Sequence, residues 1–230
     1  MPQPYRGSGD IYFARGIVQH RPELGAYIAE IALLWTLTEE AWAYLLAYML
    51  RFEAGAGITI YQALIGTGAQ RAVLNEVADK YLPDELREDF AALMKISKRR
   101  ATERNAVVHG MWFIDANIPD ALVLAPRNVI SSIHAKATRK LAEAHFARTA
   151  PPKGPSSDFS DWRVYRKEDF KAIDARLFDF FKQLDALIDK LLALRGNPPN
   201  QTLKLHLQSE SSPVAQIQTK PKARSRTRRE

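Results

Sequence analysis

The sequence contains no cysteine among its 230 residues, which excludes disulfide bonds, thiolate metal sites and catalysis by a thiol. It also has no run of about 18 consecutive apolar residues, the length that a membrane-spanning helix needs. Neither a glycine-rich phosphate loop, nor a nucleophile elbow, nor a histidine pair at metal-ligand spacing occurs in it. The first residues, MPQPYRGSGDIYFARG, lack the apolar centre of a secretion signal. We therefore expect a cytoplasmic protein that contacts no membrane and uses neither a metal nor another cofactor.

Positive charge is concentrated at one end of the chain. The formal net charge is +7, yet residues 1–195 carry 26 basic and 24 acidic side chains. Residues 196–230 carry seven basic and two acidic side chains and few large apolar residues, so we predict a disordered basic tail. Such a tail would attract phosphates in a salt-dependent and sequence-independent way. The alternative is a passive tail without a binding role.

The helical periodicity of the apolar residues predicts one domain over residues 20–195, preceded by an N-terminal arm at 1–19. Three long helices are expected at 22–52, 83–109 and 167–194. Shorter helices between the first two are divided at Gly66 and Gly68. The first long helix is apolar around most of its circumference, which predicts packing in a bundle on one side and contact with another subunit on the other.

The periodicity changes after Gly110. Two short apolar runs around Asn-Ile-Pro-Asp predict a β-hairpin at about 111–125, and WRVY at 162–165 is a candidate third strand. Residues 131–147 have a weak helical pattern, and about 149–161 should be a surface loop. The expected fold is thus mainly α, an up-and-down bundle of four to five helices with a small inserted hairpin.

Arg104 lies on the apolar stripe of the second long helix. At 100° per residue, Leu86 and Leu93 fall within about 40° of it. A guanidinium remains charged, so its burial is costly unless a partner or an anion meets it. His109 lies about 140° from Arg104 on an ideal helix, but it directly precedes Gly110, where the helix should end. We predict that Arg104 and His109 converge at this helix end.

The run RNAVVH at 104–109, followed by glycine, resembles the motif of the HEPN superfamily: arginine, a polar residue that is often asparagine, three further residues, then histidine. The resemblance is specific over residues 104–110 and loose over the bundle. RGIVQH at 15–20 has the same spacing, but a glycine follows the arginine and no long helix precedes it, so we interpret it as a chance match.

The resemblance implies a helical bundle that dimerises with its two motifs facing each other. Many members of the family are metal-independent ribonucleases, including toxins and defence effectors, so RNA and an antitoxin protein are candidate partners. By position, Arg104 and His109 would be the catalytic pair, with Asn105 in a supporting role.

The residue types suit RNA cleavage without a metal. Histidine can act as base or acid near neutral pH, and arginine presents a fixed fork of donors to phosphate oxygens. The reaction needs two proton-handling groups while each chain supplies one such histidine, so a homodimer that brings two copies of His109 to one phosphate would complete the site.

Several neighbouring residues are candidates for binding or orientation. Lys98, Arg99 and Arg100 precede the motif and would bind substrate. Trp112 either belongs to the hairpin core or offers a flat surface on which a base could stack. Glu39 and Glu40 interrupt the apolar run of the first long helix, where they are either solvated or paired acids, or one of them orients the Arg104 site.

The alternative to a ribonuclease is a protein in which the motif has no catalytic role. If Arg104 pairs with Glu39, Glu40 or Glu103, and His109 only favours the negative end of the helix, both residues are structural. The protein would then be a dimeric module that binds RNA, a nucleotide or another protein. A DNA-associated regulator would rest on the basic tail alone, since the sequence shows no convincing helix-turn-helix.

Overall fold

The computed structural model describes residues 1–7, 11–13, 16–126 and 159–198, with scattered positions between 131 and 146. Three predicted features lie mostly outside these residues: the weak helix at 131–147, the loop at 149–161 and the basic tail at 196–230.

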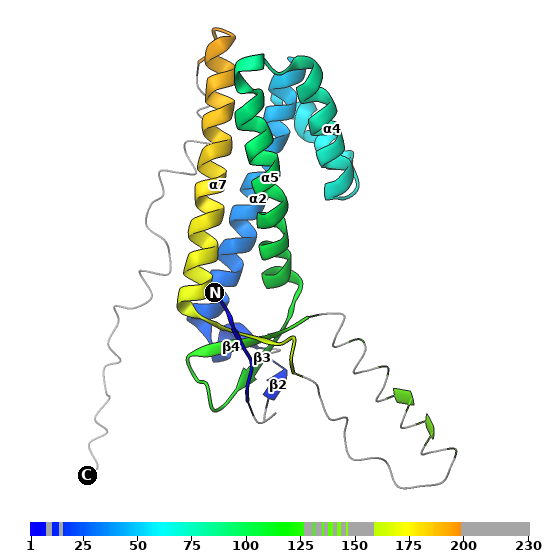
Figure 1. Cartoon of the computed structure of the whole chain (residues 1–230), viewed down its shortest axis with the longest axis vertical. Coiled ribbons are helices and arrows are strands. Elements are labelled where there is room, and N and C mark those ends of the chain that lie inside the picture. Colours follow the sequence, from blue (N-terminus) through cyan, green and yellow to red (C-terminus); the bar gives the residue numbers. More distant parts are fainter. Residues whose placement is uncertain are drawn as a thin grey trace, which may run out of the picture.

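Helices make up most of the described chain, which confirms the mainly α fold. The long helices are α2 (Pro22–Leu50), α5 (Asp84–His109) and α7 (Lys167–Leu194). They lie side by side, with α5 running opposite to α2 and α7 (Figure 1). The shorter helices are α1 (Ile17–His20), α3 (Ala54–Ala63) and α4 (Thr67–Tyr81). Within the described residues, none of these helices combines the length and the apolarity that crossing a bilayer requires.

Local sequence accounts for the limits of α5. Pro83 precedes its first residue, and Asp84 and Glu85 place negative charge in the first turn, where the helix dipole favours it. Neither proline nor glycine interrupts the next 24 residues, and His109 occupies the last turn. The helix can therefore run without a break from one end of the bundle to the candidate motif.

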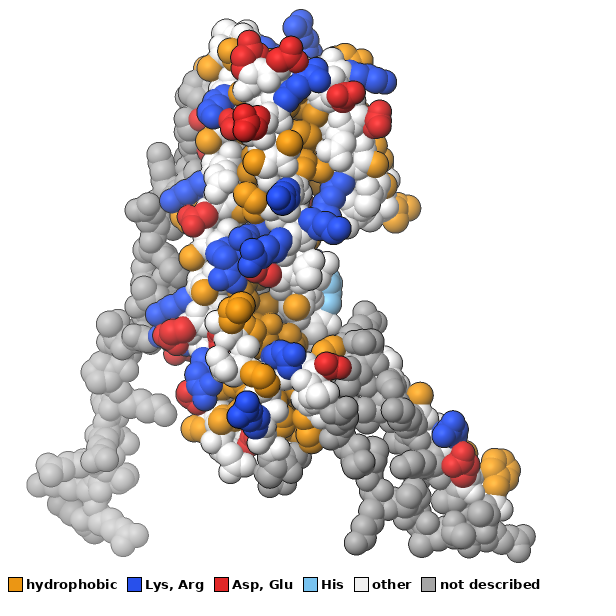
Figure 2. Space-filling view, in the orientation of Figure 1, with side chains coloured by type: hydrophobic (Ala, Val, Ile, Leu, Met, Phe, Trp, Pro, Cys, Tyr) orange, Lys and Arg blue, Asp and Glu red, His pale blue; other side chains and the backbone are white. Residues whose placement is uncertain are grey.

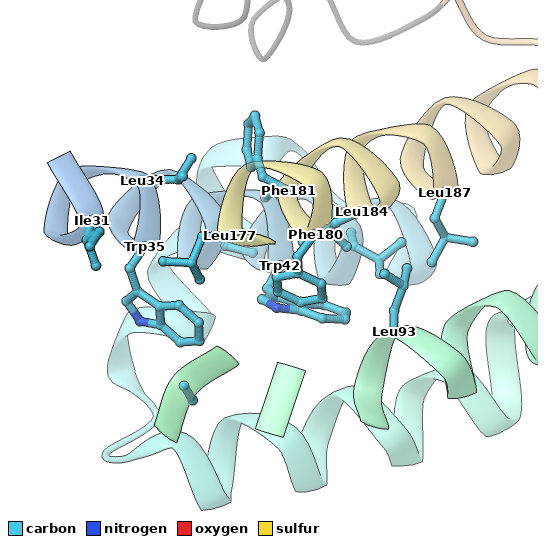
Figure 3. Packing of buried hydrophobic residues seen from close by; sticks show 14 of the residues in the cluster. Ile31, Leu34, Trp35, Trp42, Leu93, Leu177, Phe180, Phe181, Leu184 and Leu187 are labelled. Carbon is cyan, nitrogen blue, oxygen red and sulfur yellow. The ribbon is translucent and has the colours of Figure 1, made fainter. Parts of the chain in front are cut away.

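The bundle core forms where apolar stripes of the three long helices meet. Trp42 from α2, Leu93 from α5 and Phe180 from α7 are among its buried side chains (Figure 3). Helix α2 contacts α3, α4, α5 and α7, so helices of the same chain cover most of its apolar surface. The sequence predicted that α2 packs in a bundle on one side and contacts another subunit on the other. Packing within one chain covers the bundle side, and Leu33 is still 61% exposed.

A five-stranded antiparallel sheet lies at the end of the bundle where α5 finishes (Figure 1). Its order is β1-β5-β4-β3-β2, with these bounds: β1 Gln3–Pro4, β5 Arg163–Arg166, β4 Ala121–Ala125, β3 Met111–Asp115 and β2 Ile11–Phe13. The predicted hairpin and third strand are thus its three central strands. The N-terminal segment, expected to be a separate arm, instead supplies both edge strands, with Gln3 paired to Val164 and Ile11 to Asp115.

Strand β4 is buried on both faces. Leu122 and Leu124 belong to the bundle core, whereas Ala121, Val123 and Ala125 join a second cluster with Tyr5 and Trp162. Alternation of side chains along a strand produces this division. The sheet is therefore attached to the bundle by one face and closed by its own aromatic residues on the other.

The contact between α3 and α2 yields a stability prediction. A Cβ atom at Gly57 would lie 2.3 Å from Ala47 Cβ, whereas one at Gly55 would meet no heavy atom within 4 Å. We expect Gly57→Ala to lower the free energy of unfolding by about 1–3 kcal/mol through overpacking. Gly55→Ala, the matched control in the same helix, should leave it unchanged or raise it by up to about 1 kcal/mol. Urea unfolding measures both, and equal effects would contradict the close approach of α3 to α2.

Candidate active site at the end of α5

Arg104, Asn105 and His109 come together in the last turns of α5. The Nη1 atom of Arg104 donates to Asn105 Oδ1 at 2.9 Å and lies 3.2 Å from His109 Nε2. The predicted convergence of Arg104 and His109 is therefore present in a single chain. Since a guanidinium has only donors, a hydrogen bond across this contact needs His109 Nε2 as the acceptor, with a ring proton on Nδ1.

The guanidinium of Arg104 rests on an aromatic ring. Arg104 is half-buried, and its Cζ atom lies 5.7 Å from the centre of the Trp35 ring, which belongs to α2. Contacts of this kind contribute about 0.5–2 kcal/mol, depending on how far the cation is desolvated. Within the described part of the chain, no carboxylate lies within ion-pairing distance of Arg104, and its Nε atom is buried without a hydrogen-bond partner.

The acids near the motif have other partners. Glu39 accepts a hydrogen bond from the indole N–H of Trp35 at 2.7 Å, so it reaches Arg104 only through that ring. Glu40 accepts from the Tyr44 hydroxyl at 3.3 Å. Neither Glu39 nor Glu40 therefore contacts Arg104 directly. The structure shows no direct orienting contact from them, and no ion pair with Arg104 of the kind that the alternative interpretation assumed.

Glu103 lies at the centre of a separate cluster of basic residues. It pairs with Arg100, and with Arg176 of α7 at 3.5 Å and Arg99 at 3.8 Å. Basic side chains are visible over α5 and α7 about halfway along the bundle (Figure 2). This cluster carries more positive than negative charge on the side of α5 that faces α7.

The three basic residues predicted to bind substrate are not gathered around His109. Arg99 is 74% exposed and Arg100 only 12% exposed, and both turn to Glu103. Lys98 is exposed, but it lies eleven positions before His109, about 16 Å along an ideal helix. These side chains therefore lie away from the atoms that Arg104 and His109 contact.

Trp112 belongs to the core and not to a stacking surface. It is 9% exposed, packs edge-on against Tyr165 at 5.2 Å and lies 5.5 Å from Phe170. Its indole N–H donates to the carbonyl oxygen of Val107 at 3.0 Å. Carbonyl groups in the last turn of a helix lack partners within the helix, so Trp112 caps the turn that carries the motif. The substrate-binding role assigned to it is wrong, and the alternative, a core residue, is what the structure shows.

Glycine is required after the last residue of α5 because there is no room for a side chain at position 110. Its φ of −71° is open to any residue, so the left-handed conformation typical of glycine after a helix is absent here. A Cβ atom would lie 2.1 Å from Leu124 Cδ1 and 2.4 Å from the Ala106 carbonyl oxygen. The glycine lets strand β4 approach the helix end closely, which places the sheet directly against the motif.

Trp35 is the residue near the site that sequence reasoning missed. It is 4% exposed and lies among other apolar residues of α2, so the sequence indicates only an ordinary core residue. The one available signal was the four-residue spacing between Trp35 and Glu39, which places their side chains together on a helix. Nothing in the sequence shows that this pair faces Arg104.

Within the described residues, no group of three or more potential metal ligands comes together. Comparisons of the chain with protein-family models, with curated proteins and with solved structures give no match. The geometry of the site is therefore the basis for a functional proposal.

The cap on Val107 can be tested with two tryptophan substitutions. We expect Trp112→Phe to lower the free energy of unfolding by about 1–3 kcal/mol, because a buried carbonyl loses its donor. It should also speed hydrogen exchange at the amide of Gly110, which donates to Ala106 at 3.1 Å. Trp162→Phe is the matched control, since that indole N–H is buried without a partner among the described residues.

The control should cost less stability than Trp112→Phe and leave exchange at Gly110 unchanged. Equal losses in the two variants, with unchanged exchange in both, would show that the indole of Trp112 contributes packing and no cap.

Proposed function

We propose that this protein is a metal-independent endoribonuclease of the HEPN type, with Arg104 binding the scissile phosphate and His109 transferring protons. The observation that supports the proposal best is the contact between Arg104 and His109 at 3.2 Å, with Asn105 on the same guanidinium nitrogen. Cytoplasmic activity as a toxin or defence effector, restrained by an antitoxin protein, is part of the same proposal.

Phosphate binding would release the histidine for catalysis. In the free chain, the two hydrogens of Arg104 Nη1 are directed at Asn105 Oδ1 and His109 Nε2. When a phosphate oxygen takes the hydrogen that points to the imidazole, Nε2 regains a free lone pair beside the phosphate. Charge-assisted hydrogen bonds to phosphate are stronger than those to a neutral ring, so the exchange is favourable.

The reaction then proceeds by transesterification. His109 Nε2 takes the proton of the ribose 2′-hydroxyl, and the 2′-oxygen attacks the adjacent phosphorus. The bond from phosphorus to the 5′-oxygen breaks, and this leaving oxygen receives a proton from a second acid. The products are a 2′,3′-cyclic phosphate and a free 5′-hydroxyl, and Arg104 stabilises the charge on the phosphorane oxygens in between.

A second copy of the chain would supply the second acid. In the described part of one chain, the histidine beside Arg104 is His109, and it cannot take one proton and donate another in the same step. A two-fold dimer with the ends of two α5 helices facing each other would place two imidazoles and two guanidinium groups around one phosphate. Asn105 and His109 are exposed, so these side chains are available to such a partner.

Incubation of the purified protein with RNA in EDTA tests the proposed ribonuclease activity. We expect cleavage in EDTA, with 2′,3′-cyclic phosphate ends, and a loss of about 10²–10⁴-fold in rate for His109→Ala and Arg104→Ala. One variant serves as the matched control and should retain activity: His20→Ala, in the chance copy of the motif. RNA that stays intact at every protein concentration would favour the binding module.

Light scattering and a mixing experiment test the dimer. We expect a mass of twice the 26.0 kDa of one chain. If both copies of His109 are needed, co-refolding the wild type with a tenfold excess of His109→Ala should lower the activity per wild-type chain by about tenfold, because most wild-type chains enter mixed dimers. A monomer, or unchanged activity in the mixture, would leave the two-histidine scheme without its second acid.

A further inference from the structure

Arg104 differs from Arg100 and Arg195, two other partly buried arginines of this chain, in what supports it. Arg100 pairs with the carboxylate of Glu103. Arg195 donates to backbone oxygens of α2 and of the end of α4, including Met49 at 3.3 Å. The guanidinium of Arg104 meets an amide oxygen, an imidazole nitrogen and the face of Trp35. Its positive charge is therefore not compensated by any described neighbour.

Trp35 is a fixed support. The side chain is 4% exposed and its indole N–H donates to Glu39 Oε1 at 2.7 Å. Burial restricts the position of the ring, and the hydrogen bond to a residue one turn later restricts its rotation. Glu39 lines the same small pocket as Tyr61 and Arg71. Burial raises the pKa of the Tyr61 phenol, the Glu39 charge raises it further and the Arg71 charge lowers it. Both restraints limit how far the ring under Arg104 can turn.

An aromatic support suits an arginine that must bind an anion. A carboxylate in the place of Trp35 would hold the guanidinium, but it would occupy donors and cancel the charge that attracts phosphate. The π face of an indole attracts the cation and takes none of its hydrogens. The Glu39 charge lies at the N–H edge of the indole, where it polarises the ring toward a more negative face without touching Arg104.

We propose that Trp35 is a positioning residue for Arg104, and that Glu39 acts by fixing and polarising the indole. The inference rests on the proposed ribonuclease and adds to it the means by which the phosphate-binding arginine is kept oriented and fully charged. In this scheme neither Trp35 nor Glu39 touches the substrate.

The test uses matched substitutions at two buried tryptophans of α2. Trp35→Leu removes the aromatic face, and Trp35→Phe keeps a weaker face without the bond to Glu39. Glu39→Gln keeps an acceptor for the indole N–H and removes the charge. Trp42→Leu is the control: Trp42 extends from the same side of α2, is 3% exposed and packs on Phe90 and Phe180 at 6.1 and 6.2 Å (Figure 3).

The kinetic readout is the split between kcat and KM on RNA, measured well below the unfolding temperature of each variant. We expect Trp35→Leu to lower kcat/KM by about 10–10²-fold, the cost of a misplaced catalytic group, with Trp35→Phe and Glu39→Gln between it and the wild type. Trp42→Leu should lose comparable stability and stay within about threefold of the wild-type kcat/KM. Equal losses at Trp35 and Trp42 would overturn the proposal.

A second readout does not depend on RNA cleavage. In the full ¹⁵N-labelled chain, the ring current of Trp35 should shift the side-chain signals of Arg104, and inorganic phosphate should shift them again. Trp35→Leu should abolish the first shift and weaken phosphate binding, whereas Trp42→Leu should preserve both. If the wild type leaves RNA intact, the ribonuclease proposal fails, and these spectra still decide whether Trp35 positions Arg104. Arg104 signals that are the same in Trp35→Leu as in the wild type would overturn it.

Discussion

The end of α5 is held from three directions, and the candidate site depends on this restraint. Trp35 of α2 lies under the guanidinium of Arg104, Trp112 of β3 donates to the carbonyl of Val107, and Leu124 of β4 packs against Gly110. A helix terminus normally frays because its last carbonyl groups lack partners. Here the bundle and the sheet together fix the last turn, so two side chains that are five residues apart can meet.

The sheet therefore has a positional role beside its structural one. Its central strand β4 contributes to two apolar clusters and links the bundle core to the aromatic residues around Trp162. The N-terminal strands extend the same sheet at both edges, which ties the start of the chain to the segment that follows the motif. Order at the candidate site thus depends on pairings between residues far apart in the sequence.

Much of the fold is readable from local patterns. The bounds of α7 and the position of β3 and β4 follow from apolar spacing. The contact of Arg104 with His109 was predicted from the place of His109 directly before Gly110, where the helix ends. The edge strands escaped prediction because runs of two or three residues, flanked by proline and glycine, become strands only through partners such as Val164. The contact of Trp35 with Arg104 could not be predicted, because the rotation of α2 relative to α5 is set by packing of the whole core.

The connection between α5 and β3 is as short as one residue. Gly110 alone separates the last residue of α5 from the first residue of β3. Strand side chains alternate between faces, so one inserted residue would turn Trp112 from the bundle to the opposite face and expose a polar gap at Val107. The length of the connection between His109 and β3 is therefore constrained more tightly than the identity of the side chains around it.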